Sequence, residues 1–352
     1  MRHNVSAVVN QHGEPHCLEL QTKNLQRLGN KDVIVKILMA GVGWADIMAR
    51  RGGYPMAPKP PFIPGYDFSG IVEEVGNQVS EFKVGDYVVG LNPQFGCYSQ
   101  YLSIAADLLV KFPKHLDPAQ VCSLPLNYLT AYCMLFNKAN IQSQQSILVH
   151  SAAGGVGSAL VQLAKRAGVK VIGTTSSSKR AMIDAQGVIS VDYKTEDFVQ
   201  VVKTKYPQGV DAAFDPIGGK NLNRSFSAIK QGGIVVSYGF SGGQFGGLLN
   251  MISGSIQLCM LNLIPNGKNA LFCALPSEVN NNKQWYRKAL SSLIVMLDRK
   301  EIEPIVSHIV PLDKAHQAHA LLESGNTIGK VVIQCTDLPS KYQSSKKLDS
   351  NN

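Results

Sequence analysis

The stretch SAAGGVGS, Ser151 to Ser158, decides the fold because of what stands on either side of it. An apolar run, SILVH at 146–150, precedes it, and a helical pattern with apolar residues at 156, 160, 161 and 163 follows it. Small residues between a strand and a helix let a ligand approach the backbone, and the helix N–H groups and dipole then face its negative charge. The pattern predicts the pyrophosphate-binding turn of a dinucleotide site, although Ala152 replaces the usual first glycine. The predicted cofactor contacts are Ala153, Gly154, Gly155, Val156 and Gly157. The alternative is a tight strand–helix connection that binds nothing.

Outward from this turn, strand and helix patterns alternate. Helical patterns lie at 156–167, from 179, and at 195–206, 219–230 and 245–262, with apolar strand-like runs between them. Such alternation is typical of a parallel sheet covered by helices on both faces. We therefore predict an α/β chain whose residues 126–275 form a doubly wound Rossmann domain.

Residues 1–125 have a different texture. Short strand-like runs such as DVIVKIL and GDYVVG are separated by Gly, Pro, Asn and Asp, which is typical of a β-barrel or sandwich. The run YPMAPKPPFIPG, 54–65, is predicted to be an ordered loop because its prolines cannot donate ladder hydrogen bonds. Residues 276–336 are expected to return to this first domain, and the polar tail 337–352 is expected to be disordered.

The end of the second strand of the alternating region bears on the kind of dinucleotide. An NAD site needs an acidic residue about 20 positions after the glycines, but GTTSSSKR, from Gly173 to Arg180, contains none. Serine hydroxyls and a lysine or arginine suit a 2′-phosphate, so NADPH is favoured over NADH. The residues assigned to this phosphate are Ser176 and Lys179, with Ser177 and Arg180 as neighbouring candidates. The alternative is a solvated helix start rich in Ser and Lys.

Composition excludes several classes of protein. The 352 residues carry 34 Lys and Arg against 25 Asp and Glu, but these charges form no basic run interleaved with aromatic residues, so no nucleic-acid partner is predicted. The seven cysteines contain no C-x-x-C pair, which indicates neither a disulfide framework nor a zinc knuckle and fits a cytoplasmic protein. The apolar segment 248–265 is interrupted by polar residues and glycine, so no transmembrane span is expected.

Six motifs, in order, carry a resemblance to a known family. AGVGWAD, PFIPGYDFSGIVEEVG, VGDYVVG, LPLNYLTAYCML, AAGGVG and DPIGG resemble the medium-chain dehydrogenase/reductase superfamily from about residue 30 to 334. The chain is similar to its zinc-free NADPH:quinone oxidoreductases and, through MARRGGY, LNYLTAY, VDYKTEDF and GVDAAFDPIGG, to the vesicle amine transport protein homologues. The resemblance implies a GroES-like β-barrel catalytic domain beside the Rossmann domain.

The same resemblance implies that no metal is bound. Where the zinc alcohol dehydrogenases of this superfamily have Cys, His and Cys ligands, this chain has Gly43, Tyr66 and approximately Leu126. Glycine and leucine offer a metal no lone pair, and a neutral phenol is a poor ligand.

Further cofactor contacts are implied by the family. Tyr193 would flank the adenosine phosphate, Asn127 and Thr130 would lie near the nicotinamide riboside, and Lys330 would reach the cofactor from the C-terminal segment. The backbone of Tyr238, Gly239 and Phe240 would meet the nicotinamide. Each of these residues also has a purely structural interpretation.

The expected reaction is hydride transfer from NADPH to a quinone or other conjugated carbonyl, because such acceptors need no Lewis acid. Trp44, Tyr54 and Tyr66 are the predicted substrate contacts, with core packing as the alternative. No catalytic acid is assigned, and solvent is expected to supply the proton. A second hypothesis is a weakly catalytic or non-catalytic NADPH-binding protein with peripheral membrane or vesicle contact through 248–265. The resemblance also implies a homodimer formed by edge pairing at ALFCAL.

Overall fold

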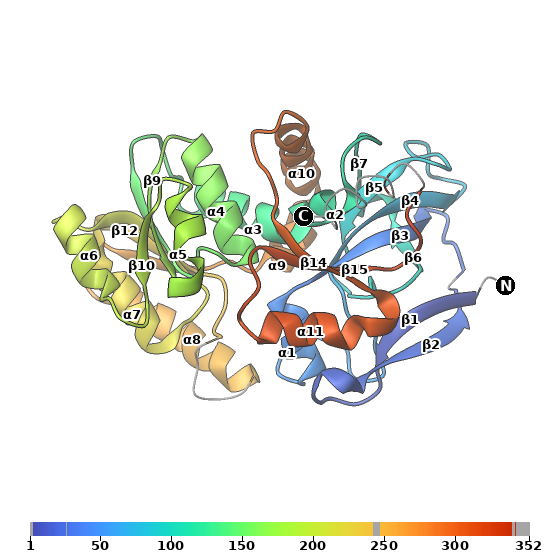
Figure 1. The fold of residues 1–352 in the computed structure, drawn as a ribbon, viewed down its shortest axis with the longest axis horizontal. Helices are drawn as coiled ribbons and strands as arrows, with labels where there is room; N and C mark the ends of the chain where they lie inside the picture. Colours follow the sequence, from blue (N-terminus) through green and yellow to red (C-terminus); the bar gives the residue numbers. More distant parts are fainter. Residues whose placement is uncertain (1–2, 26, 242–246, 340–341, 343–352) are drawn as a thin grey trace. The chain divides into compact units, whose positions relative to one another are not determined.

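The computed structural model describes residues 3–25, 27–241, 247–339 and 342 (Figure 1). The chain divides into two compact units. Unit 1 comprises 1–126, 279–300 and 306–352, and unit 2 comprises 127–278 and 301–305. Each unit is described by itself below.

Unit 2 is built on a parallel sheet. Within the described residues this sheet has six strands in the order β10-β9-β8-β11-β12-β13. The strands are β8 Ser146–Val149, β9 Lys170–Thr175, β10 Ile189–Asp192, β11 Val210–Asp215, β12 Ile229–Ser237 and β13 Asn269–Phe272. The central strand β8 is buried along its whole length, as expected for a strand covered on both faces. From β8 the chain adds β9 and β10 on one side of the sheet and then crosses over to add β11, β12 and β13 on the other side. Ligands of such folds bind beyond the carboxyl ends of the strands at this switch point, between β8 and β11.

Helices join consecutive strands of this sheet. They are α4 Gly155–Arg166, α5 Ser177–Asp184, α6 Phe198–Lys205, α7 Gly219–Ala228 and α8 Gly247–Asn262. The helices α6, α7 and α8 pack against the sheet in one hydrophobic cluster. Each helix contributes a buried residue, Phe198, Leu222 and Leu258 respectively, and the sheet contributes Leu148 and Val235. Figure 1 shows these three helices along one face of the sheet and α4 and α5 along the other. The structure confirms the predicted doubly wound fold.

A helical stretch precedes the first strand of unit 2. It consists of the π-helical turn η3 Leu124–Tyr128, the helix α3 Leu129–Tyr132 and the π-helical turn η4 Cys133–Lys138. The sequence analysis did not predict it. Its residues Leu129, Ala131, Cys133 and Leu135 are buried, so packing favours the helix despite the threonine and aromatic residues, which have modest helix propensity.

Unit 1 contains the predicted barrel-like sheet. In the described residues its path is β14-β15-β3-β4-β5-β7, with β6 also paired to β3 and a separate hairpin of β1 and β2. The strands are β1 His3–Val9, β2 Leu18–Asn24, β3 Asp32–Val42, β4 Asp67–Val75, β5 Tyr87–Leu91, β6 Tyr101–Ala105, β7 Leu109–Lys111, β14 Val306–Pro311 and β15 Lys330–Gln334. The C-terminal β15 pairs antiparallel with β3, drawn in red and blue in Figure 1, so the end of the chain completes the N-terminal sheet.

The remaining helices include several short ones and the 16-residue α10. They are η1 Pro15–Cys17, α1 Trp44–Arg50, η2 Ala106–Leu108, α2 Pro118–Cys122, α9 Leu275–Asn281, α10 Lys283–Asp298, η5 Leu312–Lys314 and α11 Ala315–Glu323. The tail expected to be disordered lies mostly outside the described residues. Of its described part, Leu338 is buried and the Tyr342 ring lies 6.4 Å from that of Tyr87, so these two residues pack against unit 1.

Candidate active site

The glycine-rich turn leaves no room for side chains. A Cβ atom on Gly157 would lie 2.0 Å from the carbonyl oxygen of Ser151, and a Cβ on Gly155 would lie 2.3 Å from the amide nitrogen of Asn127. The N-cap residue of α4 is Gly154, and among the described residues no side chain caps this helix. Its first N–H groups therefore point to the place where a pyrophosphate would be held, so the turn fits the predicted dinucleotide. The turn also brings Asn127 against the glycines.

A buried chain of hydrogen bonds links this turn to the neighbouring strands and to α7. The Ser151 N–H donates to the Thr174 hydroxyl (3.3 Å), which lies 3.1 Å from Nδ1 of His150. Nε2 of His150 lies 2.9 Å from the Ser225 hydroxyl, which donates to the Asp215 carboxylate (2.8 Å). Burial lowers the pKa of His150, so the ring is neutral, and the direction of these bonds assigns its proton to Nε2.

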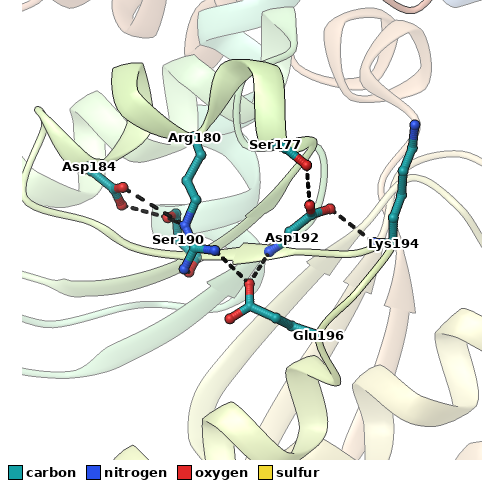
Figure 2. A network of polar contacts seen from close by, with 7 residues as sticks. All are labelled: Ser177, Arg180, Asp184, Ser190, Asp192, Lys194 and Glu196. Atoms are coloured by element: carbon teal, nitrogen blue, oxygen red, sulfur yellow. Dashed lines mark hydrogen bonds and ion pairs between the residues drawn. The ribbon is translucent and has the colours of Figure 1, made fainter.

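Figure 2 shows a second polar network, at the adenosine end of the predicted site. The Ser177 hydroxyl donates to Asp192, at the end of β10, and this bond lowers the pKa of the carboxyl. Arg180 lies 2.9 Å from Glu196 and 3.9 Å from Asp184, so carboxylates neutralise its guanidinium. An acidic residue is therefore present beside the helix start, supplied by the neighbouring strand and not by Gly173–Arg180.

Three residues assigned to the adenosine phosphate lie around this network. The Ser176 hydroxyl is 3.2 Å from that of Ser178. Lys179 is half-buried, and burial lowers the pKa of its ammonium. Tyr193 is 58% exposed and follows Asp192 directly. Lys179 is thus a second cation beside Arg180 in the first turn of α5.

The residues assigned to the nicotinamide end follow β12 or lie on α3. The Tyr238 N–H donates to the carbonyl of Asp215 (3.1 Å), and a Cβ on Gly239 would lie 2.9 Å from the Pro216 oxygen. The Phe240 ring stacks on Phe272 at 5.2 Å between centroids, so its side chain belongs to the core. Thr130 is buried on α3.

The aromatic residues assigned to the substrate belong to unit 1. The Tyr66 ring lies 4.1 Å from Phe95, and the Tyr54 ring packs edge-on at 6.3 Å from Tyr66 and 6.1 Å from Phe95. Tyr66 is buried, its hydroxyl forms no hydrogen bond of normal geometry among the described residues, and burial, with a smaller contribution from the neighbouring Tyr54 phenol, raises its pKa well above the usual range. Trp44 opens α1 and is 47% exposed, and no ring contact joins it to this cluster in the described part of the chain.

Buried acidic groups surround this aromatic cluster. Asp46 accepts hydrogen bonds from the backbone N–H groups of Gly43 (2.9 Å) and Gly65 (2.8 Å), and burial raises its pKa to about 7. Asp67 forms an ion pair of 2.7 Å with Lys330, whose side chain is 2% exposed. The ion pair gives Lys330 a structural partner that the sequence did not predict, so its contact with a cofactor stays a proposal.

Comparison with known proteins decides the family. The chain matches the model of the alcohol dehydrogenase GroES-like domain over residues 29–114 and that of a zinc-binding dehydrogenase over 183–333. It is 32% identical to the synaptic vesicle membrane protein VAT-1 homolog of Danio rerio over 88% of this chain and 66% of that protein. For the homolog of Homo sapiens the identity is 30%, over 87% of this chain and 79% of that protein.

A solved structure supports the same family assignment. The quinone oxidoreductase of Escherichia coli complexed with NADPH has a TM-score of 0.85 and 27% identity, over 94% of this chain and 99% of that one. The chain is a medium-chain dehydrogenase/reductase of the branch that contains the VAT-1 homologs. The family, the GroES-like domain and the Rossmann domain expected from the sequence are thus confirmed.

In this medium-chain dehydrogenase/reductase, Gly43 and Leu126, which the resemblance matches approximately to two zinc-ligand positions, lie close together. A Cβ on Gly43 would lie 2.9 Å from a methyl carbon of Leu126, so the leucine side chain fills the space beside the glycine. Within the described ranges no three His, Cys, Asp or Glu side chains group closely enough to hold a metal. Gly43 and Leu126 offer a metal no lone pair, and the nearby carboxylate of Asp46 accepts hydrogen bonds from the backbone N–H groups of Gly43 and Gly65.

Proposed function

We propose that this chain is a zinc-independent, NADPH-dependent reductase of quinones or other conjugated carbonyls. The observation that supports the proposal is that a Cβ on Gly43 would lie 2.9 Å from a methyl carbon of Leu126, the two residues that the resemblance matches to zinc-ligand positions. A bound NADPH would supply hydride, and an electrophilic acceptor needs no metal to accept it. The quinone oxidoreductase of Escherichia coli, complexed with NADPH in its solved structure, supports the same reaction class.

The glycine turn and Lys179 are proposed to hold the pyrophosphate and the 2′-phosphate. The crowding at Gly157 and the uncapped start of α4 support the first contact, and the position of Lys179 in the first turn of α5, after the second strand β9, supports the second. The carboxylate of Asp192 would repel the 2′-phosphate, so the preference for NADPH over NADH is expected to be moderate. Ser176, Tyr193, Asn127, Thr130 and the backbone at Tyr238–Phe240 complete the proposed contacts.

Tyr66 is proposed to orient the substrate. A buried hydroxyl without a partner costs about 1–3 kcal/mol, and a carbonyl oxygen of the substrate would remove that cost by accepting its hydrogen bond. Because burial raises the pKa of Tyr66, the phenol stays neutral and can donate across the physiological range. The faces of Tyr54 and Tyr66 suit a planar acceptor.

The proposal is tested by a matrix of NADPH and NADH against quinones, enals and simple aldehydes. We expect turnover of quinones or enals and none of aldehydes, with NADPH favoured. Tyr66→Phe should lower kcat/KM by about tenfold without weakening NADPH binding, whereas Tyr206→Phe, at the end of α6, should have no effect. Tight NADPH binding with no turnover of any acceptor would contradict the proposal.

A second candidate function, membrane or vesicle association, is favoured by one surface. Leu249, Ile252, Ile256, Met260 and Leu263 are exposed and follow one another at helical spacing along α8 and just beyond it. The sequence contains no charged residue between Lys230 and Lys268. No helix in the described parts of the chain is long and apolar enough to cross a membrane, so contact would be peripheral.

Flotation with liposomes tests this candidate. Ile256→Glu with Met260→Glu should abolish binding, while Ile189→Glu, at an exposed isoleucine on β10, should not. If wild-type protein does not float but the double variant changes the oligomeric state, the surface joins copies of this chain. A homodimer through the edge strand β13 and a cytoplasmic location remain part of the proposal.

A further inference from the structure

Two buried cysteines of unit 2 meet although they lie far apart in the sequence. Cys133 begins η4 and Cys273 directly follows β13, with 140 positions between them. The Cys273 thiol donates to the Cys133 sulfur across 3.9 Å. Both side chains are buried, whereas Cys259 on α8 is exposed.

The surroundings of Cys133 favour its thiolate. The hydrogen bond from Cys273 is the main cause that lowers the pKa of Cys133, and the nearby ammonium of Lys138 adds to it. Lys138 is itself held 2.7 Å from Glu278. By contrast, burial raises the pKa of Cys97 and of Cys122. Because the thiolate is the reacting form of cysteine, Cys133 is the expected nucleophile of the pair.

The pair also joins two segments that the proposed function places at the nicotinamide end. Cys133 lies three residues after Thr130 in the same helical stretch. The Cys273 N–H donates to the carbonyl of Ser237 (2.8 Å), the residue before Tyr238. A change in the distance between the two sulfurs would therefore shift Thr130 relative to Tyr238.

We propose that Cys133 and Cys273 form a reversible disulfide when a hydroperoxide oxidises the protein, and that the disulfide weakens NADPH binding. The Cys133 thiolate would attack the peroxide oxygen, giving a sulfenic acid and releasing hydroxide. The Cys273 sulfur would then displace the sulfenic oxygen, so that two thiols and one hydrogen peroxide yield one disulfide and two waters. The sulfurs must close from 3.9 Å to about 2.0 Å, which draws the end of β13 toward η4.

The effect on NADPH rests on the proposed function, but the cross-link does not. The test uses full-length Cys259→Ser protein, which lacks the exposed thiol, treated with hydrogen peroxide under native conditions and then alkylated. Peptide mapping should find Cys133 joined to Cys273, with Cys122 and Cys97 alkylated only after unfolding. Calorimetry should show NADPH binding at least about fivefold weaker in the oxidised form, restored by dithiothreitol.

Matched variants separate the outcomes. Cys273→Ala should lose both the cross-link and the effect of peroxide on NADPH affinity, while Cys122→Ala should keep both. Absence of the cross-linked peptide would overturn the inference, and so would a complete cross-link that leaves NADPH affinity unchanged. If the reduced protein fails to bind NADPH, the proposed function fails, whereas peptide mapping still decides the cross-link.

Discussion

At the scale of single residues, the site depends on positions where the backbone admits no side chain. The carbonyl of Ser151 occupies the space that a Cβ on Gly157 would need, and backbone atoms cannot move aside as the end of a side chain can. At Gly41 the obstacle is a pair of side chains instead: a Cβ would lie 2.3 Å from the carboxylate of Asp67 and 2.6 Å from the ammonium of Lys330, which the buried ion pair holds in place. Glycine at these positions is required by contacts and not by flexibility.

Gly157→Ala is therefore expected to displace the turn that is proposed to hold the pyrophosphate. We expect NADPH affinity to fall by about tenfold or more, because the lost N–H contacts carry charge-assisted hydrogen bonds. Calorimetry measures the affinity, and circular dichroism checks that the variant is folded. Gly13→Ala, where the nearest atom would be 3.6 Å away, should bind NADPH like the wild type. Equal affinities for all three proteins would refute the pyrophosphate assignment.

His319 predicts a pH dependence of stability. It is buried against the Tyr98 hydroxyl (3.1 Å), and burial lowers its pKa to about 3. Since the unfolded chain binds this proton below about pH 6.5, the stability that the neutral ring provides is lost as the pH falls from there toward 3.

In His319→Gln this contribution disappears. The difference in unfolding free energy between wild type and variant should shrink by about 1.4 kcal/mol per pH unit between roughly pH 6 and 4. Urea unfolding at several pH values measures it. Comparing the two proteins cancels the opposite effect of Asp46, whose raised pKa favours the folded state as the pH falls. Parallel pH profiles would show that His319 is protonated in the fold.

At the scale of secondary-structure elements, the sequence predicted what local periodicity determines and missed what neighbouring elements determine. The helices and strands of unit 2 follow apolar patterns, and the turn at Ser151–Ser158 joins a strand to a helix as predicted. The seven-residue helix α1 lies between strand-like runs, and its pattern is too short to stand out. The sequence did not predict Asp192 at the adenosine end, because only the pairing of β10 with β9 brings this residue there.

Asp192→Asn tests how these two elements set cofactor preference. Removing a negative charge that accepts from Ser177 should raise affinity for NADPH relative to NADH severalfold, because only NADPH carries a 2′-phosphate. Asp184→Asn removes a carboxylate that faces Arg180 instead and should change the ratio less. Calorimetry with both cofactors gives the ratio. A shift toward NADH in Asp192→Asn would contradict this placement of the adenosine phosphate.

At the scale of the whole molecule, the family and fold were predictable because six motifs occur in order along most of the chain. Contacts between distant segments could not be predicted from the sequence. Leu126 against Gly43, Cys133 against Cys273 and Lys330 against Asp67 join residues that no local pattern pairs. Lys330 is an example of a contact that a family resemblance does not reveal. The resemblance assigned it to the cofactor, while its ammonium lies in a buried ion pair with Asp67.

That ion pair ties the C-terminal strand to β4 across 263 positions of sequence. Lys330→Met leaves a buried, unpaired carboxylate at Asp67 and should lower the unfolding free energy by about 3–5 kcal/mol. Adding Asp67→Leu should restore most of the loss, because an apolar pair avoids the desolvation cost. Urea unfolding of both variants checks this. A single variant as stable as the wild type would mean that the carboxyl is protonated without its partner.

The central claim is that hydride transfer here proceeds without zinc. It is tested most directly by the initial rate of NADPH oxidation with a quinone, measured on protein dialysed against a strong chelator and again after zinc is added back. Zinc-independent hydride transfer should give the same rate in both samples and in untreated protein. A rate that disappears with the chelator and returns with zinc would contradict it.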